Sequence, residues 1–172
     1  GLAHIQNLSF LVTAEQRFLN SPIGSYLGAV AYPNEFGTFG LTFNYFGIDA
    51  FNEQKIGFAY ARQLFDNFSI GAQFDFLNTQ IQDYGSTNAI TFELGCLINI
   101  LPDLTFGFHL YNPVQVELIE GESLPAVYKA GIGYQPSKKA LVTIEVEKDI
   151  DYNARFRAGL EYQFLDTFFL RV

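Results

Sequence analysis

Apolar and polar residues alternate along most of this chain, in segments of about eight to twelve residues that end at Gly, Pro, Asn or Asp. In the segment 68–77, every second residue is Phe, Ile or Ala, and Ser, Gly, Gln and Asp stand between them. No segment shows a clear helical period. The pattern predicts about eleven strands and no helix. The predicted strands are 8–18, 25–32, 37–48, 55–64, 68–77, 90–101, 104–111, 126–135, 141–148, 155–164 and 168–172.

The connections between these strands alternate in length along the chain. The longer ones are 20–24, 47–54, 82–88, 113–124 and 149–153, and the shorter ones are 33–36, 66–67, 102–103, 136–139 and 166–167. In an up-and-down meander every second connection lies at the same end, so all the short turns gather at one end. Transmembrane β-barrels have this asymmetry. We therefore expect an all-β, antiparallel up-and-down transmembrane β-barrel, with residues 1–172 as a single domain.

The composition indicates which face of the strands meets lipid and which faces the interior of the barrel. The 172 residues include 19 Phe and 10 Tyr, and only 16% of them are charged, against roughly 25% in an average soluble domain. So many aromatic rings would overfill the inside of a small barrel, and several Tyr lie near strand ends, where membrane proteins carry aromatic girdles. We expect the apolar face to meet lipid and the Gly- and Ala-rich face to line a crowded interior. A soluble barrel with the opposite orientation remains the alternative.

Charged side chains on the polar face are then assigned to the lumen. They are Glu15, Arg17, Asp75, Glu93, Lys129, Glu145, Glu147, Arg155, Arg157, Glu161 and Arg171, and His109 lies on the same face. Both signs are present in near balance. Two interpretations stay open: a structural network of ion pairs that fills a narrow barrel, or a polar channel or ligand site.

The sequence offers little other chemistry. A net charge of −8 with only 10 Lys and Arg argues against nucleic acid as a partner. His109 with Glu93 or Asp75 could form an acid–base pair, but a lumen histidine held by a neighbour is the commoner arrangement. We expect no catalytic site, no metal site and no cofactor.

The longest connection, 113–124, is acidic with interleaved apolar residues. Its candidate residues are Glu117, Leu118, Ile119, Glu120 and Glu122. It is expected to be either a mobile extension of a hairpin or an element that binds a partner or gates the barrel.

Several segments resemble one family of outer-membrane proteins. The start, Gly-Leu-Ala at 1–3, looks like the end of the Asn-Pro-Ala-Gly-Leu-Ala signature of FadL-like and PorV-like proteins of Bacteroidetes. The hairpin rhythm of that family is matched at 68–72, 104–113, 124–134 and 157–162, the last leading into 169–171. The resemblance spans nearly the whole chain, and its motifs are degenerate hairpin patterns.

This resemblance implies a location in the bacterial outer membrane, with lipid and other secretion-machine subunits as partners. It implies a non-enzymatic accessory or shuttle component of a type IX secretion or surface-attachment machine, as in PorV-like and PorQ-like proteins. The alternative, FadL-like, is a transporter or channel for hydrophobic or small polar molecules, and a soluble ligand-binding β-barrel is a third. Because known members are larger, we expect a complete protein of about 10–14 strands, with flanks on both sides of this chain.

Overall fold

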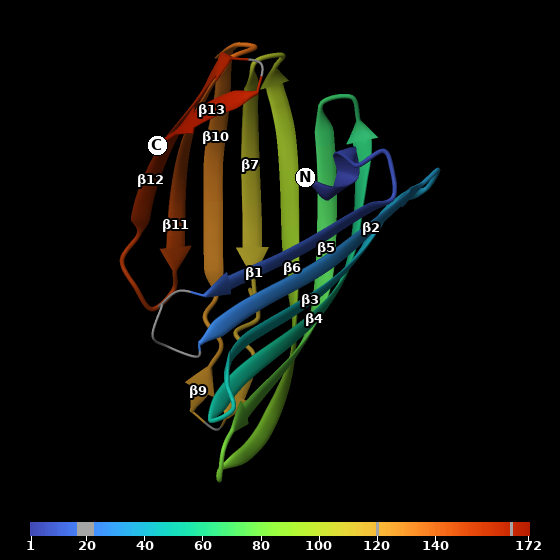
Figure 1. The fold of residues 1–172 in the computed structure, drawn as a ribbon. Coiled ribbons are helices and arrows are strands. Elements are labelled where there is room, and N and C mark those ends of the chain that lie inside the picture. Colours follow the sequence, from blue (N-terminus) through green and yellow to red (C-terminus); the bar gives the residue numbers. More distant parts are fainter. Residues whose placement is uncertain (17–22, 120, 166) are drawn as a thin grey trace.

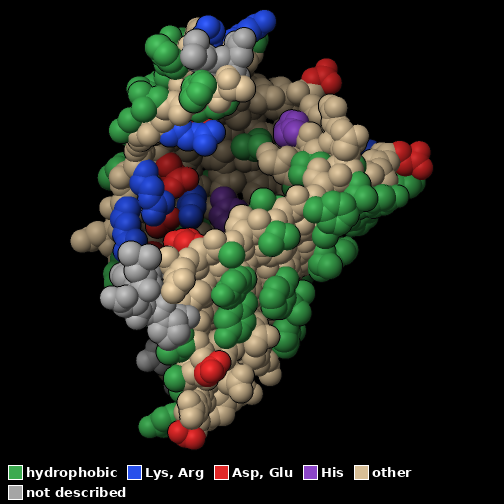
Figure 2. All heavy atoms as spheres, viewed as in Figure 1, with side chains coloured by type: hydrophobic (Ala, Val, Ile, Leu, Met, Phe, Trp, Pro, Cys, Tyr) green, Lys and Arg blue, Asp and Glu red, His purple; other side chains and the backbone are tan. Residues whose placement is uncertain are grey.

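The computed structural model describes residues 1–16, 23–119, 121–165 and 167–172, most of which form one long antiparallel sheet curled around a hollow (Figures 1 and 2). Eleven strands pair in chain order. They are β1 (Ser9–Gln16), β2 (Gly24–Asn34), β3 (Gly37–Ile48), β4 (Phe51–Phe65), β5 (Phe68–Ile81), β6 (Gly85–Leu101), β7 (Leu104–Tyr111), β10 (Val127–Ser137), β11 (Ala140–Asp149), β12 (Arg155–Leu165) and β13 (Phe168–Arg171). A small hairpin of β8 (Glu117–Ile119) and β9 (Glu122–Ser123) lies between β7 and β10 in the chain.

This topology confirms the predicted fold class and places all eleven predicted strands in one sheet. Two connections differ from the prediction. Instead of loops over 47–54 and 82–88, β3 and β4 are joined by only Asp49 and Ala50, and β5 and β6 by 82–84. The strands continue through polar residues there, where alternation is lost because neither face meets lipid. As a result β4, β5 and β6 are 15, 14 and 17 residues long, beyond the roughly 9–11 that cross a bilayer.

Burial in this sheet is the reverse of that in a soluble protein. The accessible surface is 12064 Å², well above the roughly 8,500 Å² expected for a compact monomer of this mass. Among the described residues, every buried hydrophobic residue is an alanine, and the largest fully buried side chains are Asn112, Thr91 and Asp75. Large apolar side chains point outward instead, with Phe74 64% and Phe156 79% exposed. The apolar face is therefore the outer wall, as predicted, and the small and polar residues face the hollow.

The short 3-10 turn η1 (Leu2–His4) lies near the wall formed by β3, β4 and β5. The side chain of Leu2 approaches Gly40 closely, where the strand carries no side chain. His4 Nε2 lies 3.3 Å from Ser69 Oγ on β5. The N-terminal segment thus occupies part of the interior. In the described part of the chain, no helix has the length and apolar character needed to cross a membrane.

Candidate functional site

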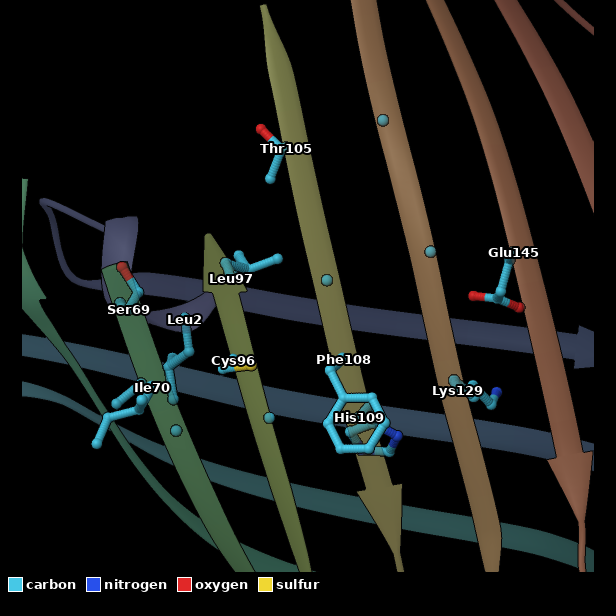
Figure 3. Close-up of a pocket in the computed structure, with 18 of the residues that line it drawn as sticks. Leu2, Ser69, Ile70, Cys96, Leu97, Thr105, Phe108, His109, Lys129 and Glu145 are labelled. Atoms are coloured by element: carbon cyan, nitrogen blue, oxygen red, sulfur yellow. The ribbon is translucent and has the colours of Figure 1, made fainter. Parts of the chain in front are cut away.

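The hollow contains a cavity of about 880 Å³, lined by β4, β5, β6, β7, β10, β11 and β12 together with residues of η1 (Figures 2 and 3). Glycines at its wall explain much of this space: Gly95 on β6, Gly107 on β7, and Gly131 and Gly133 on β10. With no side chain at these positions, the wall leaves open volume. The interior is therefore hollow here, rather than crowded as the sequence suggested.

One ionisable side chain from each of seven neighbouring strands lies on the inner face of the sheet, and we call this set the charged belt. Its members are Lys55 on β4, Asp75 on β5, Glu93 on β6, His109 on β7, Lys129 on β10, Glu147 on β11 and Arg157 on β12. Of these, Glu93, His109, Lys129 and Arg157 line the cavity itself. The sheet register aligns part of it directly, since Lys129 pairs with His109 on one side and with Glu147 on the other. In the space-filling view, charged and His side chains gather on one wall of the hollow (Figure 2).

Lys55 is the centre of the first half of the belt. Its Nζ donates a hydrogen bond of 2.8 Å to Glu93 Oε1 and lies 3.5 Å from Asp75 Oδ2. It also sits 5.4 Å from the ring centroid of Tyr111, within cation–π range. Glu93 Oε2 in turn lies 2.8 Å from His109 Nε2. Glu93 thus bridges a cation and a histidine from two different strands.

Glu147 and Arg157 organise the second half of the belt. Lys129 Nζ lies 3.0 Å from Glu147 Oε2. Arg157 Nη1 donates to both Glu145 Oε1, at 2.9 Å, and Glu147 Oε2, at 2.8 Å. In the close-up, Lys129 on β10 and Glu145 on β11 are drawn with His109 on β7 among the residues that line the cavity (Figure 3). The second half of the belt is thus held by ion pairs between adjacent strands.

The structure joins most of the residues that the sequence assigned to the lumen. Arg155 lies at the margin, 4.0 Å from Glu147 and 64% exposed, and Glu161 pairs separately with Arg171. Glu15 also faces inward on β1, whereas Arg17 lies outside the described residues.

Sequence reasoning missed Lys55, the main cation of the first half. Its position two residues before Gly57, on the polar face of the same strand, was the signal that could have found it.

The side chains of the belt form a network of ion pairs on the inner face of the sheet. His109 and Glu93 are in contact, but the same carboxylate is bound to Lys55, so the pair belongs to the ion-pair network. In the described part of the chain, no group of three His, Cys, Asp or Glu residues is placed to hold a metal ion. The acidic loop forms the β8–β9 hairpin, with Glu117 and Leu118 on β8; Glu120 and the side chains of Ile119 and Glu122 lie outside what the structure describes.

The fold is similar to that of a solved structure described as KdgM porin. The two structures match with a TM-score of 0.57 and 16% sequence identity, over 87% of this chain and 81% of the porin. No family model matches the chain, and no curated protein matches it either. The likeness supports the predicted β-barrel architecture. It gives no support to the FadL-like and PorV-like assignment.

Proposed function

We propose that this chain forms an outer-membrane channel of the porin type, through which small polar solutes pass. The observation that carries the proposal is the open cavity of about 880 Å³ on the inner side of the curled sheet, whose outer face is apolar and whose inner face carries charged side chains. Charged side chains such as Lys55 and Arg157 are stable at membrane depth only where they face partners and water, which favours an interior that polar solutes can enter. The likeness to a porin supports the same function.

The test uses a pair of adjacent positions on β10 that face opposite ways. An ideal Cβ at Gly133, which lines the cavity, meets only Leu141 at 3.8 Å, so this position has room for a side chain to begin. Ile132 is 46% exposed on the outer wall. Gly133→Trp is expected to lower single-channel conductance in a planar lipid bilayer severalfold, and Ile132→Trp to leave it unchanged.

The same proteins are compared in liposome swelling with sugars of increasing size. Swelling that stops at a smaller sugar in Gly133→Trp supports passage through the cavity. If the unchanged protein gives neither conductance nor swelling, or if Gly133→Trp conducts like the unchanged protein, the proposal is wrong.

The role as a component of a type IX secretion machine stays a prediction from the family resemblance. Its measurement is co-purification of secretion subunits with the protein from outer membranes, in the absence of conductance. Outer-membrane lipid as the partner of the apolar wall, and the absence of catalysis, belong to the same proposal of a passive channel.

A further inference from the structure

The outer wall changes its chemistry at one register position of β2 to β6. Up to that position it is apolar, and its last apolar row consists of exposed side chains that pair from strand to strand: Phe43 on β3, Ile56 on β4, Phe76 on β5 and Ile90 on β6. The strands do not end there. They continue toward the end of the barrel where the long connection 113–124 lies, and in Figure 1 β3 to β6 reach beyond the lower ends of β7 and β10.

The next row on the same outer face is uncharged and polar, and we call it the interface row. It lies two residues farther along each strand, and its members also pair in register: Tyr26 on β2, Tyr45 on β3, Gln54 on β4, Asn78 on β5 and Asn88 on β6. Three adjacent strands therefore replace an apolar side chain by a primary amide at the same step. The interface row marks the place where the outer wall leaves the hydrocarbon region of the membrane.

The amides of this row keep hydrogen-bonding groups for an outside partner. Asn78 Nδ2 donates a bond of 2.8 Å to Asn88 Oδ1 across the β5–β6 pair. Gln54 Nε2 donates one of 3.2 Å to Asn52 Oδ1 on the same strand. A primary amide has two N–H donors and an oxygen with two lone pairs, so one such bond leaves it with both a donor and an acceptor. Asn88 is exposed, and Gln54 and Asn78 are partly exposed.

Two tyrosine rings continue the row on β2 and β3. The ring centroids of Tyr26 and Tyr45 are 6.1 Å apart, and Tyr26 is 52% exposed. A tyrosine offers an apolar ring face together with a hydroxyl group, which suits the boundary between lipid and water. The row thus combines flat apolar faces with groups that both donate and accept hydrogen bonds.

The charge of the surface indicates which head group fits it. Lipid phosphates are held by Lys and Arg. Among the described residues of β2 to β6, the outer face carries a single charged side chain, Arg62, and it lies near the opposite end of β4. Sugar hydroxyls, by contrast, donate and accept as primary amides do, and the C–H face of a sugar packs on an aromatic ring. The interface row is therefore complementary to sugar rather than to phosphate.

We propose that the interface row binds the uncharged sugar units of glycolipid head groups in the leaflet on the side of the long connection 113–124, which in an outer-membrane barrel is the external side. Acyl chains that lie against Phe76 and Ile90 bring the head group of the same lipid to Asn78 and Asn88. The amides bind the sugar hydroxyls, and Tyr45 packs against a sugar ring. This role belongs to the outer wall and does not depend on conduction through the lumen.

The first experiment compares stability in three kinds of vesicle with the same acyl chains: phosphatidylcholine alone, with an uncharged digalactosyl lipid, and with anionic phosphatidylglycerol. A lipid that binds the folded state raises the urea midpoint of unfolding. We expect the digalactosyl lipid to raise the midpoint more than phosphatidylglycerol does. The triple variant Gln54→Ala, Asn78→Ala, Asn88→Ala should lose this shift.

A matched control removes three other exposed amides, which lie near the short turns. The triple variant Gln63→Ala, Asn99→Ala, Gln135→Ala loses as many amides but should keep the full shift. Because each variant is compared with itself in phosphatidylcholine, a general loss of stability cancels. Folding is checked by heat-dependent mobility on a gel, and Asn88→Ala alone, at an exposed position, repeats the test with a smaller change and should reduce the shift.

The second experiment measures binding directly. Detergent-solubilised protein is titrated with the digalactosyl lipid, and bound lipid is counted by native mass spectrometry. We expect the interface-row triple variant to bind at least about tenfold more weakly than the unchanged protein, because several hydrogen bonds are lost together.

Three results would overturn the proposal. A digalactosyl shift that is equal in the unchanged protein and in the interface-row triple variant means that the sugar binds elsewhere. A shift of the same size with phosphatidylglycerol means that the wall does not distinguish sugar from phosphate. A protein that is dimeric in detergent, and becomes monomeric in the interface-row triple variant, means that the row is a contact between two copies of this chain.

Discussion

Removing the cation at Lys55 should destabilise the folded barrel more than the loss of any other single ion pair described above. Lys55 lies between two carboxylates from two further strands, and Asp75 is only 1% exposed. Asp75 Oδ2 accepts no hydrogen bond from the described residues, so Lys55 at 3.5 Å is its electrostatic partner. The substitution Lys55→Met keeps a similar length and removes only the charge.

The size of the effect follows from burial. Breaking a buried ion pair by removing one partner costs about 3–5 kcal/mol, because the remaining charge is left uncompensated. Lys55 retains 26% of its side-chain exposure, so we expect a value near the lower end, about 3 kcal/mol. By contrast, Arg171 is 72% exposed in its pair with Glu161, and Arg171→Met is expected to cost less than about 1 kcal/mol.

The assay is equilibrium unfolding in urea of the protein folded into lipid vesicles, with intrinsic tyrosine fluorescence as the signal. Adding Asp75→Asn to Lys55→Met should restore a large part of the lost stability, because the uncompensated carboxylate is then gone. If Lys55→Met is no more destabilising than Arg171→Met, or if Asp75→Asn fails to rescue it, the belt does not depend on this cation for its stability and the reasoning is refuted.

Three further changes test other features. Phe106→Asp on the outer face of β7 should hinder insertion into vesicles, at a cost below the roughly 2–4 kcal/mol of a Lys or Arg at mid-bilayer, while Thr105→Asp, on the lumen face, should insert normally; equal insertion would reverse the assignment of faces. Glu117→Lys should shift the reversal potential in a salt gradient toward anions, because it replaces an exposed acid at the hairpin; an unchanged potential would place Glu117 away from the ion path. Gly47→Ala should strongly destabilise the protein at the β3–β4 turn, because φ at Gly47 is +132° and an added Cβ would lie 2.2 Å from Phe51 O. Gly85→Ala is the control, since its Cβ would contact nothing and only the backbone conformation is strained. Equal melting temperatures of the two variants would contradict this reasoning.

The strands were predictable because a sheet with lipid on one side and a polar interior on the other imposes a strict period of two on the sequence. The strand boundaries were predicted wrongly where the strands extend past the region with lipid on one side. Beyond the bilayer, β4, β5 and β6 carry polar residues on both faces, so the sequence there looks like loop although the hydrogen-bonded ladder continues. Lys55 lies at this boundary, which is why its place in the lumen was missed.

The lumen was predictable in composition but not in shape. A face rich in Gly and Ala is compatible with a crowded interior and with an open one, and only the curvature of the sheet decides between them. The burial of Asn112 and its hydrogen bonds could not be predicted for another reason. Tyr-Asn-Pro at 111–113 looks like an ordinary turn signal, and nothing local indicates that the amide bonds to Thr91, which is 21 residues away.

Because no apolar residue larger than alanine is buried among the residues that the structure describes, the stability of this protein depends on the membrane around it. A soluble domain buries its apolar side chains in its own core, whereas here the apolar side chains are removed from water by contact with lipid. The apolar band on the outer face of the strands has a fixed height, even though the strands themselves differ in length. A bilayer that is thicker or thinner than this band must deform to match it. We therefore expect the midpoint of unfolding to depend on the acyl-chain length of the lipid, with a maximum at the membrane thickness that matches the apolar band. The membrane then stabilises the fold as a bound ligand does.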